Sequence, residues 1–61
     1  MKLKRWLKLA PMTNVEFAKE INVSPGAVSR WIAGVRVPRP QQMRKIMLRT
    51  NAKVGPKDFY Q

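Results

Sequence analysis

The side chains best suited to polar recognition are concentrated in one short segment, residues 24–34. Ser29 and Arg30 stand side by side there; both side chains donate hydrogen bonds, and that of Arg30 is permanently charged. Gly26 and Ala27 precede them in the same segment. Because the segment has a helical pattern, we expect one exposed helix face to carry Ser29 and Arg30, with the two small residues near its start. This face is the candidate binding surface.

Catalytic and metal-binding groups are scarce. The 61 residues include no histidine and no cysteine, so disulfides are excluded and a zinc site is not expected. The three acids are Glu16, Glu20 and Asp58, and the position of Glu16 suits helix capping rather than acid–base chemistry. The glycines do not form a phosphate-binding loop. We therefore expect no enzyme, no cofactor and no metal ion.

The net charge indicates a polyanionic partner. Thirteen Lys and Arg residues against three acids give a formal charge of +10. This charge opposes compaction, and nucleic acid is the commonest partner that offsets it. General solubility and an anionic membrane surface are the alternatives. No apolar run approaches the roughly 18 residues of a transmembrane helix, and lysines interrupt the N-terminal segment, so we expect neither a membrane span nor a signal peptide.

Apolar spacing and helix start and stop residues predict an all-α fold of four to five short helices, in a single domain over residues 1–61. The predicted helices are residues 2–10, a second helix that Thr13 opens and Asn22 ends, residues 25–33, residues 40–50, and a last turn from Pro56. Thr13 and Glu16 have the spacing of a capping box. An edge strand at residues 35–37 is a weak alternative to a plain connector.

The same spacing predicts the core. Its expected members are Leu3, Trp6, Leu7, Ala10, Val15, Phe17, Ala18, Ile21, Val23, Val28, Trp31, Ile32, Met43, Ile46, Met47 and Phe59, with Thr50 in phase with the stripe of residues 40–50. Trp6 and Trp31 could also serve as stacking platforms for single-stranded nucleic acid. The apolar stripe around Trp31 favours the core for this residue.

Two helices joined by a short turn form a helix-turn-helix unit over about residues 14–33. Ala18 is small where the helices approach each other, and four residues later Asn22 turns the chain. Over about residues 3–50 the sequence resembles the Cro/C1-type (phage repressor-like, XRE) helix-turn-helix family. The resemblance is carried by Phe17-Ala18-x-x-Ile21-Asn22-Val23-Ser24-x-x-x-Val28-Ser29-x-Trp31-x-x-Gly34-x-Arg36-x-Pro38. Asn22 replaces the family's usual glycine, and Gly26 and Ala27 stand where many members carry larger polar side chains.

The resemblance implies a lambda-repressor-like domain whose second unit helix, residues 25–33, enters the major groove of double-stranded DNA. It implies that Arg30 contacts guanine, that Ser29 contacts a base or a phosphate, and that Ala27 touches a thymine methyl group. Gly26 would let the backbone come close to the bases. Contacts with the DNA backbone are implied for Asn14, Ser24, Pro25, Arg36 and Arg39.

Several of these roles have alternatives in the residues themselves. Arg30 can bind a phosphate or remain solvated, and Ser29 can pack against the preceding helix. Ser24 can cap its helix without touching DNA, although the two roles can coexist.

The function implied by the resemblance is sequence-specific DNA binding by a transcriptional repressor that occupies an operator. Because two-fold operators require two copies, we expect a monomer or weak homodimer that pairs on DNA through residues 40–50 and the tail. The expected location is the cytoplasm of a bacterial or phage-infected cell, in association with the nucleoid. No small-molecule substrate is expected. A toxin–antitoxin autorepressor is a close variant. A cationic membrane-active peptide and a nonspecific nucleic-acid-binding module are alternatives from other classes.

Overall fold

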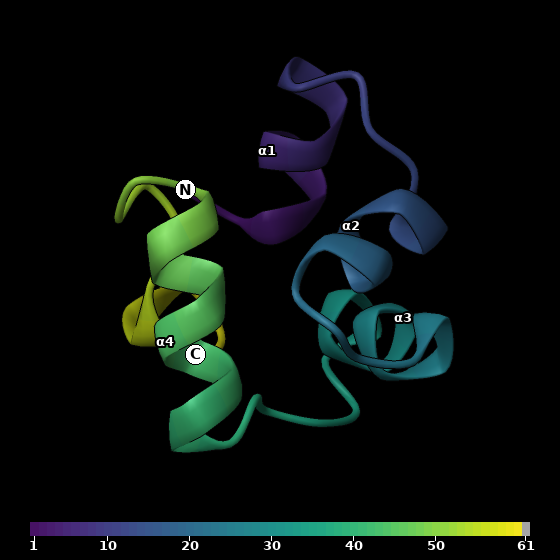
Figure 1. The fold of residues 1–61 in the computed structure, drawn as a ribbon. Coiled ribbons are helices and arrows are strands. Elements are labelled where there is room, and N and C mark those ends of the chain that lie inside the picture. Colours follow the sequence, from purple (N-terminus) through teal and green to yellow (C-terminus); the bar gives the residue numbers. More distant parts are fainter. Residues whose placement is uncertain (61) are drawn as a thin grey trace.

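The computed structural model describes residues 1–60, which form four α-helices and a final 3-10 helix (Figure 1). The elements are α1 (Leu3–Leu9), α2 (Asn14–Glu20), α3 (Pro25–Ala33), α4 (Pro40–Arg49) and η1 (Pro56–Asp58). The predicted all-α fold is confirmed. Residues 35–37 form no strand, because a lone extended segment has no neighbouring strand with which to pair. Within residues 1–60, no helix has the length and apolar character needed to cross a membrane.

The predicted caps fix where α2 and α3 begin. The Thr13 hydroxyl accepts a hydrogen bond from the Glu16 N–H at 3.1 Å, and the Glu16 carboxylate accepts one from the Thr13 N–H at 2.9 Å. This backbone donor, with the Thr13 side chain, holds the pKa of Glu16 below its ordinary value. At the start of α3 the Ser24 hydroxyl accepts from the Ala27 N–H at 3.2 Å. These bonds satisfy N–H groups that have no partner within the helix.

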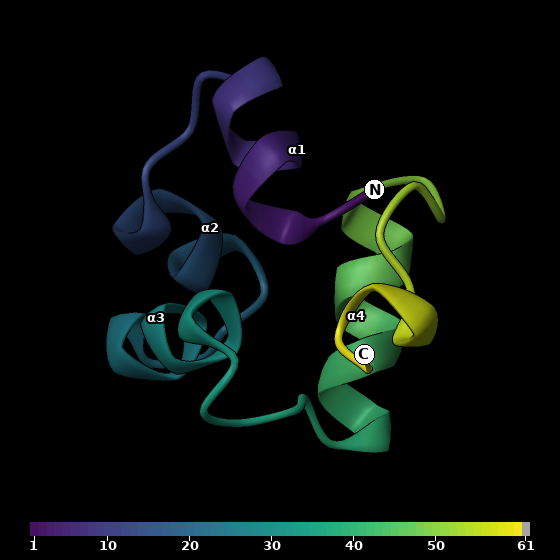
Figure 2. The same ribbon diagram turned by 180° about the vertical axis from the view of Figure 1, so that it is seen from behind.

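The turn between α2 and α3 depends on Asn22. Its φ angle of 59° lies in the left-handed region, which asparagine enters more easily than most residues. The turn is closed by a 2.9 Å hydrogen bond from the Val23 N–H to the Ala18 carbonyl. Ala18 is only 1% exposed. Its small side chain suits the close packing of α2 against α3, and the two helices form one compact unit (Figures 1 and 2).

One hydrophobic core joins all four helices and the tail. Its buried members are Leu3, Trp6, Leu7, Phe17, Ala18, Ile21, Val28, Trp31, Ile46 and Val54. Both tryptophans are buried, and the Trp6 and Phe17 ring centroids lie 5.6 Å apart in a tilted arrangement. Phe59 packs against this core from the tail, as predicted. The side chains of Trp6 and Trp31 are therefore used in the core, which disfavours their alternative role as stacking platforms for single-stranded nucleic acid.

The prediction that Val15 belongs to the core is wrong, because its side chain is 55% exposed. Val15 and Phe17 are two residues apart, which places their side chains about 200° apart around a helix. Phe17 occupies the core, so Val15 is turned toward solvent. Ala10 and Ile32 are half-buried at the margin of the core.

An ion pair links the ends of α2 and α4. Arg49 Nε lies 2.6 Å from Glu20 Oε1, and Arg49 Nη2 lies 3.3 Å from Glu20 Oε2. The Arg49 guanidinium also lies 5.3 Å from the ring centroid of Trp6 in α1. Arg49 therefore contacts two other helices and helps to fix α4 beside the helix-turn-helix unit.

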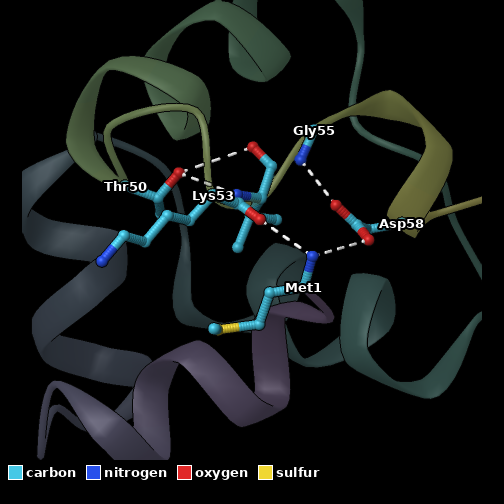
Figure 3. Close-up of polar contacts among 6 residues, drawn as sticks. Met1, Thr50, Lys53, Gly55 and Asp58 are labelled. Atoms are coloured by element: carbon cyan, nitrogen blue, oxygen red, sulfur yellow. Dashed lines mark hydrogen bonds and ion pairs between the residues drawn. The ribbon is translucent and has the colours of Figure 1, made fainter.

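The N-terminus and the tail are joined by a small polar network (Figure 3). The Met1 ammonium donates to Asp58 Oδ1 at 3.0 Å and to the Lys53 carbonyl at 2.9 Å. Asp58 Oδ2 accepts from the Gly55 N–H at 2.8 Å. Nearby, the buried Thr50 hydroxyl accepts a 3.2 Å hydrogen bond from the Val54 N–H in the segment after α4. These bonds hold the segment after α4 against the start of α1.

Candidate nucleic-acid interface

The exposed face of α3 is fixed by the residues on its opposite face. Val28 is fully buried and Trp31 is 5% exposed, so the rotation of the helix about its axis is determined by the core. Ser29 and Arg30 are consequently exposed on the solvent side, as expected. Gly26 is exposed near the start of the helix, whereas the neighbouring Ala27 is half-buried against the core.

Arg30 extends back along α3 toward the start of the helix. A Cβ atom placed on Gly26 would lie 3.8 Å from Nη1 of Arg30, so the guanidinium lies beside bare backbone. The two ion pairs within residues 1–60 involve Met1 with Asp58 and Arg49 with Glu20. The donors of Arg30 are therefore available to an external partner. They lie at the half of the helix that enters the groove in helix-turn-helix complexes.

Asn14 brings the start of α2 next to the middle of α3. Its Nδ2 donates to the Ser29 hydroxyl at 3.5 Å, the outer limit of a hydrogen bond. Both the packing and the recognition alternatives for Ser29 remain compatible with this contact, because the hydroxyl is exposed and keeps a donor of its own. Ser24 likewise accepts its capping bond while its hydroxyl hydrogen stays free to donate, and Pro25 beside it is exposed.

The connector after α3 adds two arginines to the α3 surface. Arg30, Arg36 and Arg39 line a hollow of about 220 Å³, together with Ala27, Trp31, Val37 and Gln42. The connector is tied to α3 by a 3.0 Å hydrogen bond from the Val35 N–H to the Arg30 carbonyl. This three-arginine hollow has no acidic residue in its lining and offers guanidinium groups to an anion. Asn14 and Ser24 do not line it.

Gln42 is the member of this hollow that sequence reasoning missed. Its side-chain oxygen accepts a 2.9 Å hydrogen bond from the Arg39 N–H at the start of α4. The available signal was its position, three residues after Arg39 and two after Pro40, where Gln commonly bonds back to the residue that precedes a helix. Gln42 thereby fixes the backbone of Arg39 at the start of α4.

A helix-turn-helix family model matches residues 3–53, a span that contains all four helices and both connector arginines. The chain belongs to the Cro/C1-type helix-turn-helix family. No curated protein and no solved structure matches the chain. The expected lambda-repressor-like fold is confirmed by this family and by the helices described above.

Family membership implies that the protein binds DNA and takes part in transcriptional regulation. The family is not enzymatic, which confirms the expectation drawn from the scarcity of acid–base groups. The apolar side of α1 is occupied by the core, because Leu3, Trp6 and Leu7 are all buried there. This arrangement disfavours the alternative of a cationic membrane-active peptide, which would need that apolar side for contact with lipid.

Proposed function

We propose that the chain is a sequence-specific repressor of the Cro type, in which residues 1–61 act as one domain and α3 enters the major groove of an operator. The observation that carries this proposal is the position of the Arg30 guanidinium beside the bare backbone of Gly26. Arg30 is exposed, and within residues 1–60 it forms no ion pair with an acidic residue. An arginine on a recognition helix can make two parallel hydrogen bonds to guanine. Family membership supports DNA as the partner and an intracellular site of action.

Base reading is assigned to four positions on α3. Arg30 contacts guanine, and Ser29 beside it contacts a base or the adjoining phosphate. Ala27 offers its methyl group to thymine, although the residue is half-buried against the core. Gly26 lets the helix backbone lie close to the base edges. With so few long side chains, part of the specificity must come from DNA shape and deformability.

Five further residues are assigned to the DNA backbone. Arg36 and Arg39 contact phosphates from one end of α3, where they line the three-arginine hollow. Asn14, Ser24 and Pro25 approach the backbone at the starts of α2 and α3. Each phosphate that the protein neutralises steepens the fall of binding with salt by about 0.9 in log K per log unit.

Pairing of two copies on a two-fold operator is assigned to α4 and the turn that follows it. Leu48 is 83% exposed, the largest value among the exposed large hydrophobic residues within residues 1–60. Met47, Leu48 and Ala52 line a hollow of about 490 Å³ with Arg44 and Asn51. The patch is small, which fits a weak dimer that forms on DNA rather than a permanent one. Occupancy of the operator by the pair would block polymerase.

Selection from random-sequence duplexes at physiological salt tests the proposal. A specific repressor enriches one sequence, and its affinity for that sequence exceeds its affinity for unselected DNA by about a thousandfold or more. A nonspecific nucleic-acid-binding module binds the selected and unselected pools equally. Absence of any enriched sequence would therefore refute the specific repressor while leaving the family's DNA binding intact.

A further inference from the structure

The solvent side of α1 is a second basic surface that the α3 site does not use. Lys4, Arg5 and Lys8 are exposed along this helix, and we call them the α1 basic surface. They line a hollow of about 500 Å³ with Lys2 and Leu9, and no acidic residue takes part in the lining. The two ion pairs within residues 1–60 involve neither of these lysines nor Arg5.

The α1 basic surface is held in a fixed orientation. Leu3 and Leu7 on the other side of the helix are 3% and 4% exposed, and Trp6 packs on Phe17 and beneath Arg49. The helix can therefore not rotate to bring its apolar side to a lipid bilayer without losing the core. Among the residues that line the α1 hollow, Leu9 is the single apolar one, and it is 64% exposed. This chemistry favours an aqueous polyanion over a membrane.

The α1 basic surface lies away from the α3 site. In both views α2 lies between α1 and α3 (Figures 1 and 2). The hollow on α1 and the three-arginine hollow share no lining residue. Lys4 at the start of α1 borders a cleft with Gly34 at the end of α3. Arg5 and Lys8 line the hollow on α1 but not this cleft. DNA seated on α3 thus leaves most of these cations without a partner.

We propose that the α1 basic surface binds the phosphate backbone of a second DNA duplex, so that one molecule bridges two duplex segments. The inference rests on the proposed function in taking α3 as the site for the first duplex. Lys4 and Lys8 are four residues apart, a rise of about 6 Å along the helix, so the cations form a short row. The lysine ammonium is a compact point charge without the planar pair of donors that reads a base edge. Lysine therefore suits phosphates rather than base edges.

A capture assay tests the bridge. A short duplex is immobilised and saturated with the protein, and a fluorescent duplex of unrelated sequence is then added at low salt. The wild-type chain is expected to retain the second duplex. The variant with Lys4→Gln, Arg5→Gln and Lys8→Gln should retain at least about fivefold less, because up to three phosphate contacts are removed. Its saturation of the immobilised duplex and its thermal transition report whether the α3 site and the fold are kept.

The matched control neutralises three exposed cations elsewhere, by Lys45→Gln, Lys53→Gln and Lys57→Gln. The control should capture the second duplex as the wild type does, although both variants have lost three charges. Equal losses in the two variants would assign capture to net charge and overturn the proposal. Capture by the α1 variant at the wild-type level would also overturn the proposal, because the bridge would then form without the α1 cations. Two paired copies could form such a bridge through their α3 helices alone.

The failure of this inference is distinguishable from failure of the proposed repressor. The immobilised duplex can have any sequence, so the capture assay does not depend on finding an operator. If the selection enriches an operator but the second duplex is not captured, only the bridge is rejected. If the second duplex is captured but the selection enriches no sequence, only the specific repressor is rejected. If lengthening the immobilised duplex removed capture, the flanks of that same duplex would occupy α1, and the second-duplex proposal would fail.

Discussion

The guanidinium of Arg30 lies beside Gly26, one helical turn earlier in α3, and Nη1 is 3.8 Å from the place where a Cβ of residue 26 would stand. The recognition face therefore combines one strong hydrogen-bonding group with a stretch of uncovered backbone. Few bases can be read directly by such a face, so each of its two components is expected to have a large and separable effect on DNA binding.

Replacing Arg30 by Ala should weaken binding to the selected operator by about 1–3 kcal/mol and relax the preference at one base pair. The measurement is a set of affinities for operators altered at single positions. Arg30→Lys should restore the charge but not the base preference, because lysine lacks the planar pair of donors. A uniform loss over all sequences would instead place Arg30 on a phosphate.

Gly26→Ala should change folding stability and DNA affinity in opposite directions. Alanine is favoured over glycine within helices by about 0.5–1 kcal/mol, and its Cβ makes only an ordinary contact with Arg30, so the thermal transition should rise. If the backbone of Gly26 approaches the bases, the added methyl group lowers operator affinity. Gly55→Ala, where an added Cβ would meet no atom within 4 Å, offers a comparison outside the site. Unchanged affinity would show that α3 does not come close to DNA at this point.

Arg36 and Arg39 should act mainly through the salt dependence of binding. Replacing either by Gln should reduce the slope of log K against log salt by about 0.9 if it neutralises one phosphate, with the base preferences unchanged. Titrations of the operator at several salt concentrations give the slope. Lys45→Gln, on α4 and outside the three-arginine hollow, is the matched control. Slopes equal to the wild type in both arginine variants would remove these residues from the interface.

Leu48→Gln should impair pairing on DNA without affecting the fold. The side chain is 83% exposed, so the free energy of unfolding should change by no more than about 0.5 kcal/mol. Binding to a two-fold operator should lose cooperativity, while binding to a single half-site stays the same. Val15→Gln, a change of a 55% exposed apolar side chain on α2, controls for added polarity. Full cooperativity in the Leu48 variant would place the self-contact elsewhere.

Asp58 should make stability depend on pH in the acid range. Burial by itself raises the pKa of Asp58, but hydrogen bonds from the Gly55 N–H and the Met1 ammonium outweigh it, and the pKa lies below the ordinary 3.8. The stabilisation is therefore present above pH 3.8 and is lost as the pH falls through the lower, folded-state pKa. Asp58→Asn should cost about 1 kcal/mol near neutral pH and much less in acid. Denaturant titrations of the wild type and the variant, near neutral pH and in acid, measure the loss of unfolding free energy. An equal loss under the two conditions would contradict the role of the Asp58 charge.

The sequence by itself determined the helix-turn-helix unit because its signals are local. Thr13 bonds with Glu16, and Ser24 bonds with Ala27, each across three residues. Asn22 adopts the left-handed conformation that ends α2, and the caps are set by neighbours rather than by distant packing. The periodic apolar residues then sufficed to place Ser29 and Arg30 on the solvent side of α3.

Only the tertiary structure decided contacts between residues distant in sequence. The ion pair of Arg49 with Glu20 spans 29 positions, and the bond of the Met1 ammonium with Asp58 spans 57. Neither pairing follows from helical periodicity, which assigns a side chain to a face but does not name what lies opposite. The packing of the helices around one core likewise decided three further features. These are the exposure of Val15, the position of the three arginines around one hollow, and the separation of the α1 cations from α3.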